Sequence, residues 1–355
     1  MSLNGLRSEF PVLERVAYLN AGTDGPVPRA AQDAVAREVA GEVEDGRAFA
    51  HFERRLALLD ELRAGYAELL GCPVDDMALT TSTSEGMGKI LAGMDLGPGD
   101  EIVTSDQEHP GLLGPLIAAR HRGATVRPVP FMELANAVTA TTTLVAASHV
   151  NWITGEVAPA ELADANVPVI LDGAQGAGAV PVDVRALGCV AYAAAGQKWL
   201  CGADGTGMLW IDPEFGERVR TIAPTYGSFE DASRGLESIL RAGGRRFDSA
   251  LSREALAFSF AALEVLVAAD LDALMERAAD LADTFATRLA EAGHTVAPRG
   301  RSTLVAFEYP EPTEARQRLA DQGIAVRDLP GHPYLRASVG AWNDESDLER
   351  LLKAL

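Results

Sequence analysis

A hydroxyl-rich stretch, residues 80–84, follows one apolar run and precedes a helical pattern. Serine and threonine hydroxyls, together with the free amides at the start of a helix, bind phosphate well. Thr83, Ser84 and Glu85 are therefore candidate phosphate-binding residues. An ordinary helix N-cap is the alternative. The stretch lacks the G-x-x-x-x-G-K-[ST] spacing of a nucleoside triphosphate loop, so the sequence does not indicate ATP binding.

An acid and an imidazole follow two further apolar runs. Asp172 comes directly after Val169–Leu171, where a carboxylate can bind a metal, cap a helix or pair with a cationic ring nitrogen. The glycines after it have the order G-x-x-G-x-G, which differs from a dinucleotide-binding loop. His109 follows the run that ends at Thr104. With Glu108 it makes a poor metal pair, because adjacent residues on an extended segment point apart, and we expect no metal site.

Only three of the 31 basic residues are lysines. Lys198 follows the apolar run 190–194 and has glycines on both sides, so we expect protein to shield part of its amine from water. Burial lowers the pKa of an amine, as Schiff-base chemistry requires. A lysine that extends to solvent is the alternative. Lys89 and Lys353 lie in amphipathic helical patterns, where we expect solvated surface residues.

Together these stretches offer a phosphate cradle, an imidazole, an acid and an amine. Pyridoxal 5′-phosphate is a cofactor that uses all four. Its phosphate would bind the Thr83–Glu85 turn, and its ring would stack on His109. Its pyridinium nitrogen would pair with Asp172, and its aldehyde would react with Lys198. We therefore predict that Lys198, His109 and Asp172 are catalytic.

Short apolar runs alternate with helical patterns through the first two thirds of the chain. This alternation predicts a mostly parallel sheet with helices on both faces, an α/β fold. The seven expected strands are 77–80, 101–104, 125–128, 143–147, 168–171, 190–194 and 207–211, and the expected helices are 29–46, 52–70, 85–94 and 110–122.

The pattern changes after about residue 211. A long helical stretch covers 253–292, and strands at 302–308, 324–327 and 334–338 then alternate with helices at 313–322 and 345–354. We predict a large cofactor-binding α/β domain at 15–264 and a small α+β domain at 265–355. Residues 1–14 are expected to pack on the small domain.

The composition excludes several classes of protein. The chain has 355 residues, 47% of them hydrophobic, which does not fit a disordered protein. Its formal net charge of −20 disfavours binding to a nucleic-acid backbone. No run reaches about 18 apolar residues, so no membrane association is expected. Three widely spaced cysteines and no apolar leader favour a cytoplasmic location.

The motifs around these residues resemble those of the class V aminotransferase family, which are fold-type I pyridoxal phosphate enzymes. The resemblance extends over nearly the whole chain, from about Tyr18 to Ser338, and is strongest toward cysteine/cystine C–S lyases and isopenicillin N epimerase-like proteins. The stretches that carry it are Thr83–Gly86, Glu108–Pro110, Ser148–Gly155, Leu171–Gln175 and Gln197–Gly202.

The resemblance implies further site residues. Gln175 would contact the phenolic oxygen of the cofactor, and Arg336 would hold the α-carboxylate of an amino-acid substrate. Other implied cofactor-binding residues are Asn151, Gln197 and Ser249, and the substrate pocket would include Asn20 and Gly22. The family also implies a homodimer whose active sites are shared between subunits.

Three features depart from the family pattern. Ala195 and Gln197 stand where a hydroxyl and a histidine usually contact phosphate. The stretch Arg246–Ala250 lacks the Gly-Thr that the neighbouring subunit often contributes. Residues Val326–Arg336 contain no cysteine, whereas cysteine desulfurases have a nucleophilic thiol there, and Cys201 resembles a structural cysteine. A persulfide-forming desulfurase is therefore not expected.

We expect an enzyme that joins an amino acid to pyridoxal phosphate, removes its Cα proton and eliminates a β substituent, with sulfur as the leaving atom. An aminotransferase or an epimerase with the same lysine is the alternative, since all three reactions begin at Cα. A non-catalytic relative is a third possibility, and the changes at Ala195 and Gln197 are its support.

Overall fold

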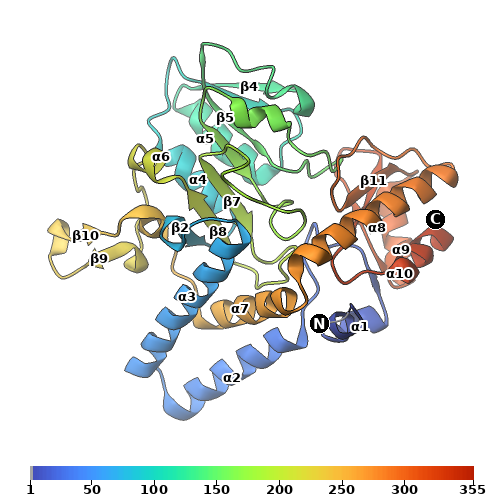
Figure 1. Ribbon diagram of the computed structural model, residues 1–355, viewed down its shortest axis with the longest axis horizontal. Helices are drawn as coiled ribbons and strands as arrows, with labels where there is room; N and C mark the ends of the chain where they lie inside the picture. The colour runs from blue at the N-terminus through green and yellow to red at the C-terminus, as the bar shows by residue number, and fades with distance from the viewer. Residues whose placement is uncertain (1–2) are drawn as a thin grey trace.

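A seven-stranded sheet forms the centre of the computed structural model, which describes residues 3–355 (Figure 1). The strand order is β2-β8-β7-β6-β5-β3-β4. Strands β7, β6, β5, β3 and β4 are parallel, and β8 is antiparallel to both of its neighbours. Strand β2 therefore ends at the same edge as the parallel strands. The bounds are β2 Met77–Thr80, β3 Glu101–Ser105, β4 Thr125–Val129, β5 Thr142–Ser148, β6 Val169–Asp172, β7 Ala191–Ala195 and β8 Gly207–Ile211.

Helices cover both faces of this sheet, so its central strands are apolar throughout. On β6, Ile170 belongs to the cluster formed with helices α4 (Thr83–Gly93) and α5 (Pro110–His121). Its neighbour Leu171 belongs to the cluster formed with α3 (Phe49–Leu69) and α7 (Arg253–Ala268), because successive side chains point to opposite faces. Helix α2 (Arg29–Asp45) lies along α7, and the short α6 (Pro213–Glu217) follows β8.

A second, smaller sheet forms near the C-terminus. Strands β11 (Leu304–Glu308), β14 (Tyr334–Ser338) and β13 (Arg327–Asp328) pair antiparallel in that order. Helices α8 (Leu271–Glu291), α9 (Pro312–Asp321) and α10 (Glu345–Ala354) pack around it over a separate core. β1 (Ala17–Tyr18) pairs parallel with β12 (Ile324–Ala325), which joins the start of the chain to this unit.

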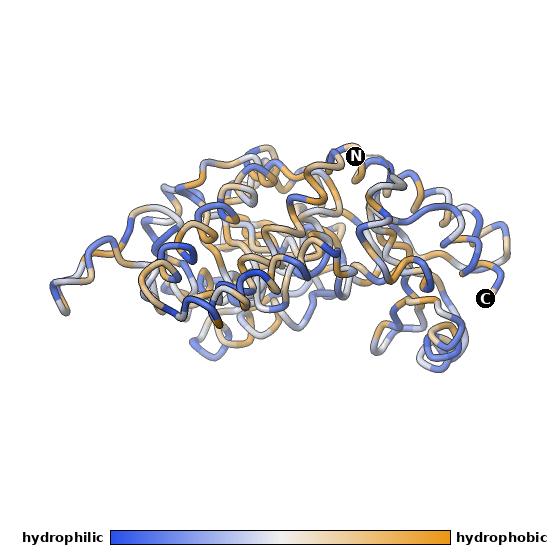
Figure 2. Tube along the Cα trace, turned by 90° about the horizontal axis from the view of Figure 1, so that it is seen from below, coloured by the Kyte–Doolittle hydropathy of each residue, from blue (hydrophilic) through white to orange (hydrophobic). Residues whose placement is uncertain are grey.

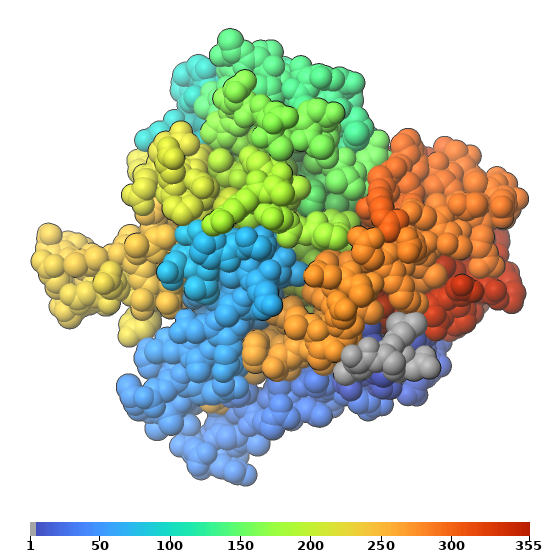
Figure 3. Space-filling view, viewed as in Figure 1, coloured from blue at the N-terminus to red at the C-terminus, as the bar shows by residue number. Residues whose placement is uncertain are grey.

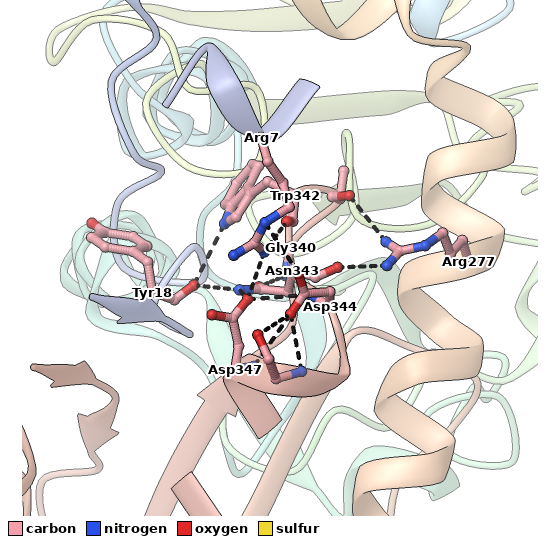
Figure 4. A network of polar contacts seen from close by, with 10 residues as sticks. Arg7, Tyr18, Arg277, Gly340, Trp342, Asn343, Asp344 and Asp347 are labelled. Atoms are coloured by element: carbon pink, nitrogen blue, oxygen red, sulfur yellow. Dashed lines mark hydrogen bonds and ion pairs between the residues drawn. The ribbon is translucent and has the colours of Figure 1, made fainter. Parts of the chain in front are cut away.

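The N-terminal helix α1 (Leu3–Ser8) is also fastened near this unit (Figure 4). Arg7 Nη1 donates to Trp342 O at 2.7 Å and to the Asp347 carboxylate at 2.8 Å. Asn343 Nδ2 donates to Tyr18 O at 3.1 Å and to the same carboxylate at 3.0 Å. These bonds hold α1 and β1 against the turn that precedes α10.

An arm, residues 220–242, projects from one end of the molecule and contains the hairpin of β9 (Phe229–Asp231) and β10 (Ile239–Leu240). Figures 2 and 3 show it standing clear of the main body from two directions. The arm carries exposed apolar side chains, namely Ile222, Tyr226, Leu236 and Ile239. In the described part of the chain, no helix combines the length and hydropathy needed to cross a bilayer.

The predicted fold class is confirmed: all seven predicted strands form one mostly parallel sheet, and a smaller sheet follows. The predicted long helical stretch is two helices, because Asp270 adopts a left-handed conformation (φ 64°) and caps α8 by accepting from Ala273 N at 3.2 Å. The predicted domain boundary at 264/265 lies inside α7, and the division into domains stays a prediction, as does the packing of residues 1–14 as a whole.

Candidate active site

The parallel sheet brings the predicted residues to one edge. Thr83 follows β2, His109 follows β3 and Lys198 follows β7, while Asp172 is the last residue of β6. Because these strands run in the same direction, their carboxyl ends lie side by side. Such an edge is where open α/β sheets bind their ligands.

The turn before α4 presents unused hydrogen-bonding groups. Ser82 caps the helix and accepts from Glu85 N at 3.1 Å. The Thr83 hydroxyl is buried and has no hydrogen-bond partner among the described residues. The Glu85 carboxylate is occupied, because its Oε2 accepts from Thr81 N (2.6 Å) and Thr81 Oγ1 (2.7 Å). Thr83 and the exposed Ser84 are therefore available to an anion at this helix start, whereas Glu85 shapes the turn.

His109 caps α5 and is held as a neutral ring. Its Nδ1 accepts from Gly111 N at 3.1 Å, which leaves Nε2 to carry the proton. The Trp152 ring meets it edge to face, with 5.1 Å between ring centroids. Burial, helped by the positive charges of Lys198 and Arg336, lowers the pKa of His109 to about 4. The imidazole is thus uncharged at neutral pH.

Asp172 and Lys198 influence each other across the site. Asp172 is buried, and its Oδ1 accepts from Ala174 N at 2.9 Å. Burial raises the pKa of Asp172, and the positive charge of Lys198 opposes that shift. Desolvation lowers the pKa of the half-buried Lys198 to about 8, while the charge of Asp172 opposes it. The neutral, nucleophilic amine is therefore much more populated near neutral pH than in an exposed lysine, although the ammonium form still predominates.

Gln175 holds a loop from the start of the chain over this edge. Its Nε2 donates to Gly22 O at 2.8 Å, and its Oε1 accepts from Trp199 Nε1 at 3.0 Å. A Cβ on Gly22 would lie 2.8 Å from both Arg336 Nη2 and Ser338 Oγ, so a larger residue here would displace these side chains. Asn20, also on this loop, accepts from the Thr23 hydroxyl at 2.9 Å.

Arg336 lies beside this loop and is only 2% exposed. Its Nη1 donates to Trp152 O, and its Nε has no hydrogen-bond partner in the described chain. Burial and the charge of Arg327 lower the pKa of Arg336 to about 9. These features fit a guanidinium that can bind an anionic ligand.

Sequence reasoning missed Arg327. It is the direct cross-strand partner of Arg336 in the antiparallel pair β13–β14, so both side chains project from the same face. Among the described residues, no carboxylate forms an ion pair with either guanidinium. Like charges directly opposite one another are unfavourable, and an anion between them would relieve that repulsion. The Pro330-Gly331 turn between the two strands was the available signal for this pairing.

Sequence reasoning considered Glu108 only as a metal partner. Its buried carboxylate accepts from the hydroxyls of Ser105 (2.7 Å) and Ser148 (2.5 Å), and from Ser148 N (3.0 Å). Burial raises the pKa of Glu108 to about 7. Glu108 therefore ties the end of β3 to the end of β5, directly before His109.

Of three further predicted residues, Asn151 and Ser249 make side-chain hydrogen bonds within the chain, and Gln197 makes none among the described residues. Asn151 Nδ2 donates to Gln107 Oε1 at 2.6 Å, and Asn151 Oδ1 accepts from Ile153 N at 2.9 Å, so the amide shapes the turn after β5. The Gln197 side-chain oxygen is buried and has no partner among the described residues. The buried Ser249 hydroxyl donates to Glu85 Oε1 at 2.6 Å, beside the turn before α4.

The prediction that Lys89 is a surface residue is wrong. Its side chain is 6% exposed, and its Nζ donates to Phe247 O at 2.6 Å and to Ser249 Oγ at 2.7 Å. Helical spacing placed it on a polar side of α4, but residues 247–249 cover that side. Lys353 is 80% exposed and pairs with Glu349 at 3.4 Å.

Cys201 is buried three residues after Lys198, at a positive φ of 54°. Its backbone N donates to Lys198 O at 3.1 Å, and burial raises the pKa of its thiol. The residue thus shapes the turn that follows the lysine.

Comparisons with known proteins agree with this arrangement. The family model described as aminotransferase class-V matches residues 19–351. Isopenicillin N epimerase of Amycolatopsis lactamdurans is 31% identical, over 98% of this chain and 96% of its own. Cysteine desulfurase CsdA of Escherichia coli (strain K12) is 29% identical over the same shares.

Two solved structures of C-DES have the same fold. A C-DES mutant with glycine covalently linked to the PLP cofactor has a TM-score of 0.91 and 27% identity, covering 98% of each chain. The complex of the cystine C-S lyase C-DES with its reaction product cysteine persulfide has a TM-score of 0.89 and 28% identity, covering 97% of this chain and 98% of that one.

Proposed function

Because this chain belongs to the class V aminotransferase family, whose cofactor is pyridoxal 5′-phosphate, we propose that it cleaves the carbon–sulfur bond of a cystine-like amino acid by β-elimination. The observation that carries this proposal is the segment 326–336, which presents two facing arginines and no thiol. One guanidinium serves the α-carboxylate, and the second serves a distal anion of the substrate.

The residues at the sheet edge fit the cofactor. The Thr83 hydroxyl, which has no partner among the described residues, and the α4 amides suit its phosphate. The free atom of the Gln197 side chain is its oxygen, which only accepts hydrogen bonds, so it offers nothing to the phosphate in this orientation. Asp172 suits a cationic ring nitrogen, and neutral His109 offers a flat face. When bound, pyridoxal phosphate draws electrons away from Cα of the attached amino acid and so makes the Cα proton acidic.

Each proposed role uses the chemistry of the side chain. Lys198, with its lowered pKa, removes the proton from Cα as a general base. Asp172 would pair with the ring nitrogen, and the positive charge of Lys198 partly opposes the rise in the pKa of Asp172 that burial causes. Arg336 orients the α-carboxylate so that the Cα–H bond faces the lysine. The contacts proposed from the resemblance for Gln175, Asn151, Ser249 and Asn20 remain proposals.

The reaction balances without a carrier thiol. Loss of the Cα proton and of the sulfur substituent from Cβ, followed by hydrolysis, converts cystine and water into pyruvate, ammonia and the persulfide of cysteine. A desulfurase would instead transfer sulfur to its own cysteine. Because residues 326–336 supply none, sulfur leaves with the product.

We also propose a homodimer in the cytoplasm. Support comes from the apolar side chains that the arm and the start of α3 leave exposed, among them Leu236, Tyr226 and Phe49, the last 72% exposed. A cavity of about 500 Å³ between the arm and α3, lined by Phe52, Leu59 and Phe229, continues this apolar surface. All three cysteines are unpaired, as in a reducing compartment.

The direct test is incubation of the purified protein with cystine, cysteine and S-substituted cysteines, with pyruvate as the readout. We expect pyruvate from cystine and none from the Lys198→Ala variant. Absence of pyruvate with every substrate would refute β-elimination. The visible absorbance band of bound cofactor, lost in Lys198→Ala, separates an enzyme from a non-catalytic relative.

Epimerisation is the second candidate, and the 31% identity to an isopenicillin N epimerase favours it. Deuterium exchange at Cα without formation of pyruvate would support an epimerase. Keto-acid-dependent conversion of the cofactor to its amine form would support an aminotransferase.

A further inference from the structure

Lys89 is a buried cation that the proposed reaction does not use. Its ammonium has three hydrogens and three partners: Phe247 O at 2.6 Å, Ser249 Oγ at 2.7 Å and Glu85 Oε1 at 3.2 Å. Burying a charged amine is costly unless it is paired and hydrogen-bonded in this way. Because each of the three ammonium hydrogens has a partner, the Lys89 side chain is held in one position.

The partners of Lys89 form a cluster with the turn before α4. Glu85 accepts from the Ser249 hydroxyl with one carboxylate oxygen and from Thr81 N and Oγ1 with the other. Burial opposes ionisation, but the Ser249 and Thr81 hydrogen bonds, with the charge of Lys89, hold the pKa of Glu85 below its usual range. The side chains of Lys89, Glu85 and Ser249 thus join three segments: the α4 start, the turn at residue 81 and residues 247–249.

The other side of residues 247–249 is fastened to β2. Ser249 N donates to Leu79 O at 2.8 Å, and Asp248 Oδ1 accepts from Leu79 N at 2.9 Å. Asp248 also forms a two-bond ion pair with the buried Arg63 (2.8 and 2.9 Å). Residues 247–249 therefore form a rigid support against which Lys89 holds the turn.

The charges of Glu85 and Lys89 affect how the start of α4 can bind a phosphate. Glu85 is the third residue of α4, and its carboxylate is 29% exposed at the helix start proposed to hold the phosphate. An uncompensated carboxylate there would repel a phosphate dianion. Lys89 lies one helical turn further along α4 and neutralises it, so the positive end of the helix dipole acts on the phosphate unopposed.

We propose that Lys89 is a positioning residue for the phosphate of the cofactor: by neutralising Glu85 and joining it to Ser249, it keeps the turn Thr81–Glu85 in its phosphate-binding form. This inference rests on the proposed binding of the cofactor phosphate at Thr83 and Ser84. It assigns no direct contact between Lys89 and the cofactor.

The test compares two ligands that differ only in the phosphate. The full-length chain, stripped of cofactor, is titrated with pyridoxal 5′-phosphate and with pyridoxal, in wild type, Lys89→Met and the control Lys353→Met. We expect Lys89→Met to weaken binding of pyridoxal phosphate about tenfold or more and to leave pyridoxal binding unchanged. Lys353→Met should match wild type, because that lysine is exposed.

A double variant separates charge from packing. Glu85→Gln with Lys89→Met removes both charges, so it should recover part of the affinity lost in Lys89→Met. Should Lys89→Met not fold, Ser249→Ala keeps the ion pair and removes only the hydroxyl bridge, and a severalfold loss restricted to pyridoxal phosphate is expected.

Equal weakening of both ligands, or no change in either, would overturn the role of Lys89. In that case the phosphate site would still stand if the wild type prefers pyridoxal phosphate over pyridoxal. A wild type without that preference would overturn both the proposed phosphate site and this inference.

Discussion

The replacement of Arg327 by Met tests whether the second arginine recognises the distal end of the substrate. The change removes a half-buried guanidinium that faces Arg336 across β13–β14 and retains an apolar side chain of similar length. If Arg327 binds a distal carboxylate, only substrates with that group lose affinity. Cystine has the group, and S-ethylcysteine does not.

The expected magnitude follows from the charge of the contact. A hydrogen bond between two charged groups contributes about 1.5–3 kcal/mol, and each 1.4 kcal/mol is tenfold. The variant should therefore lose about 10- to 150-fold in kcat/KM for cystine and little for S-ethylcysteine. Without substrate, the loss of a like charge opposite Arg336 should leave the protein as stable as wild type or up to about 1 kcal/mol more stable.

The assay measures pyruvate release by coupling to lactate dehydrogenase, with thermal unfolding measured in parallel. Arg316→Met is the matched control, because Arg316 pairs with Asp328, the neighbour of Arg327, at 2.9 Å. Similar losses on both substrates would refute a role in distal recognition. An unchanged kcat/KM for cystine would refute any substrate contact of Arg327.

Three further changes test other parts of the structure. Arg63→Leu leaves the buried carboxylate of Asp248 without its ion-pair partner and should lower the free energy of unfolding in urea by about 3–5 kcal/mol. The double variant Arg63→Leu with Asp248→Leu should regain most of that stability. Equal stability of the single and double variants would contradict this. Gly22→Ala places a Cβ 2.8 Å from Arg336 Nη2 and should raise KM about tenfold or more while the fold stays intact. An unchanged KM would show that the loop moves without displacing Arg336. Burial lowers the pKa of His149 from 6.5 to about 4, so the stability that its neutral form contributes is complete above pH 6.5 and is lost as the pH falls toward 4. The melting temperature should fall over that range, and His149→Gln should flatten the curve; an identical slope in the variant would disprove the assignment.

The strands and the sheet edge were predictable because they depend on local patterns. Buried parallel strands are short continuous apolar runs, and the runs ending near Thr80, Asp172 and Ala195 are of this kind. Parallel strands share one edge, so the order of the motifs along the chain was enough to bring Thr83, Asp172 and Lys198 together.

Contacts between distant segments were not predictable in the same way. The amphipathic pattern of α4 predicts a surface position for Lys89, and nothing in its own helix indicates that Phe247 and Ser249 cover it. The pairing of Arg327 with Arg336 depends on the register of a hairpin, which a one-residue shift would reverse. The break between α7 and α8 depends on the left-handed backbone of Asp270 (φ 64°), which aspartate tolerates but does not require.

Helix α1 and strand β1 are bonded to the C-terminal unit rather than to the large sheet. Arg7 and Tyr18 are bonded to the turn before α10 (Figure 4). Asn20 forms a bridge with Ser338, two residues after Arg336. The Gly22 loop and Arg336 are therefore joined to each other through the small sheet. Gln175 Nε2 donates to Gly22 O and Gly25 N donates to Gln197 O, both at 2.8 Å, so the same segment is also bonded to the sheet edge that holds Asp172 and Lys198.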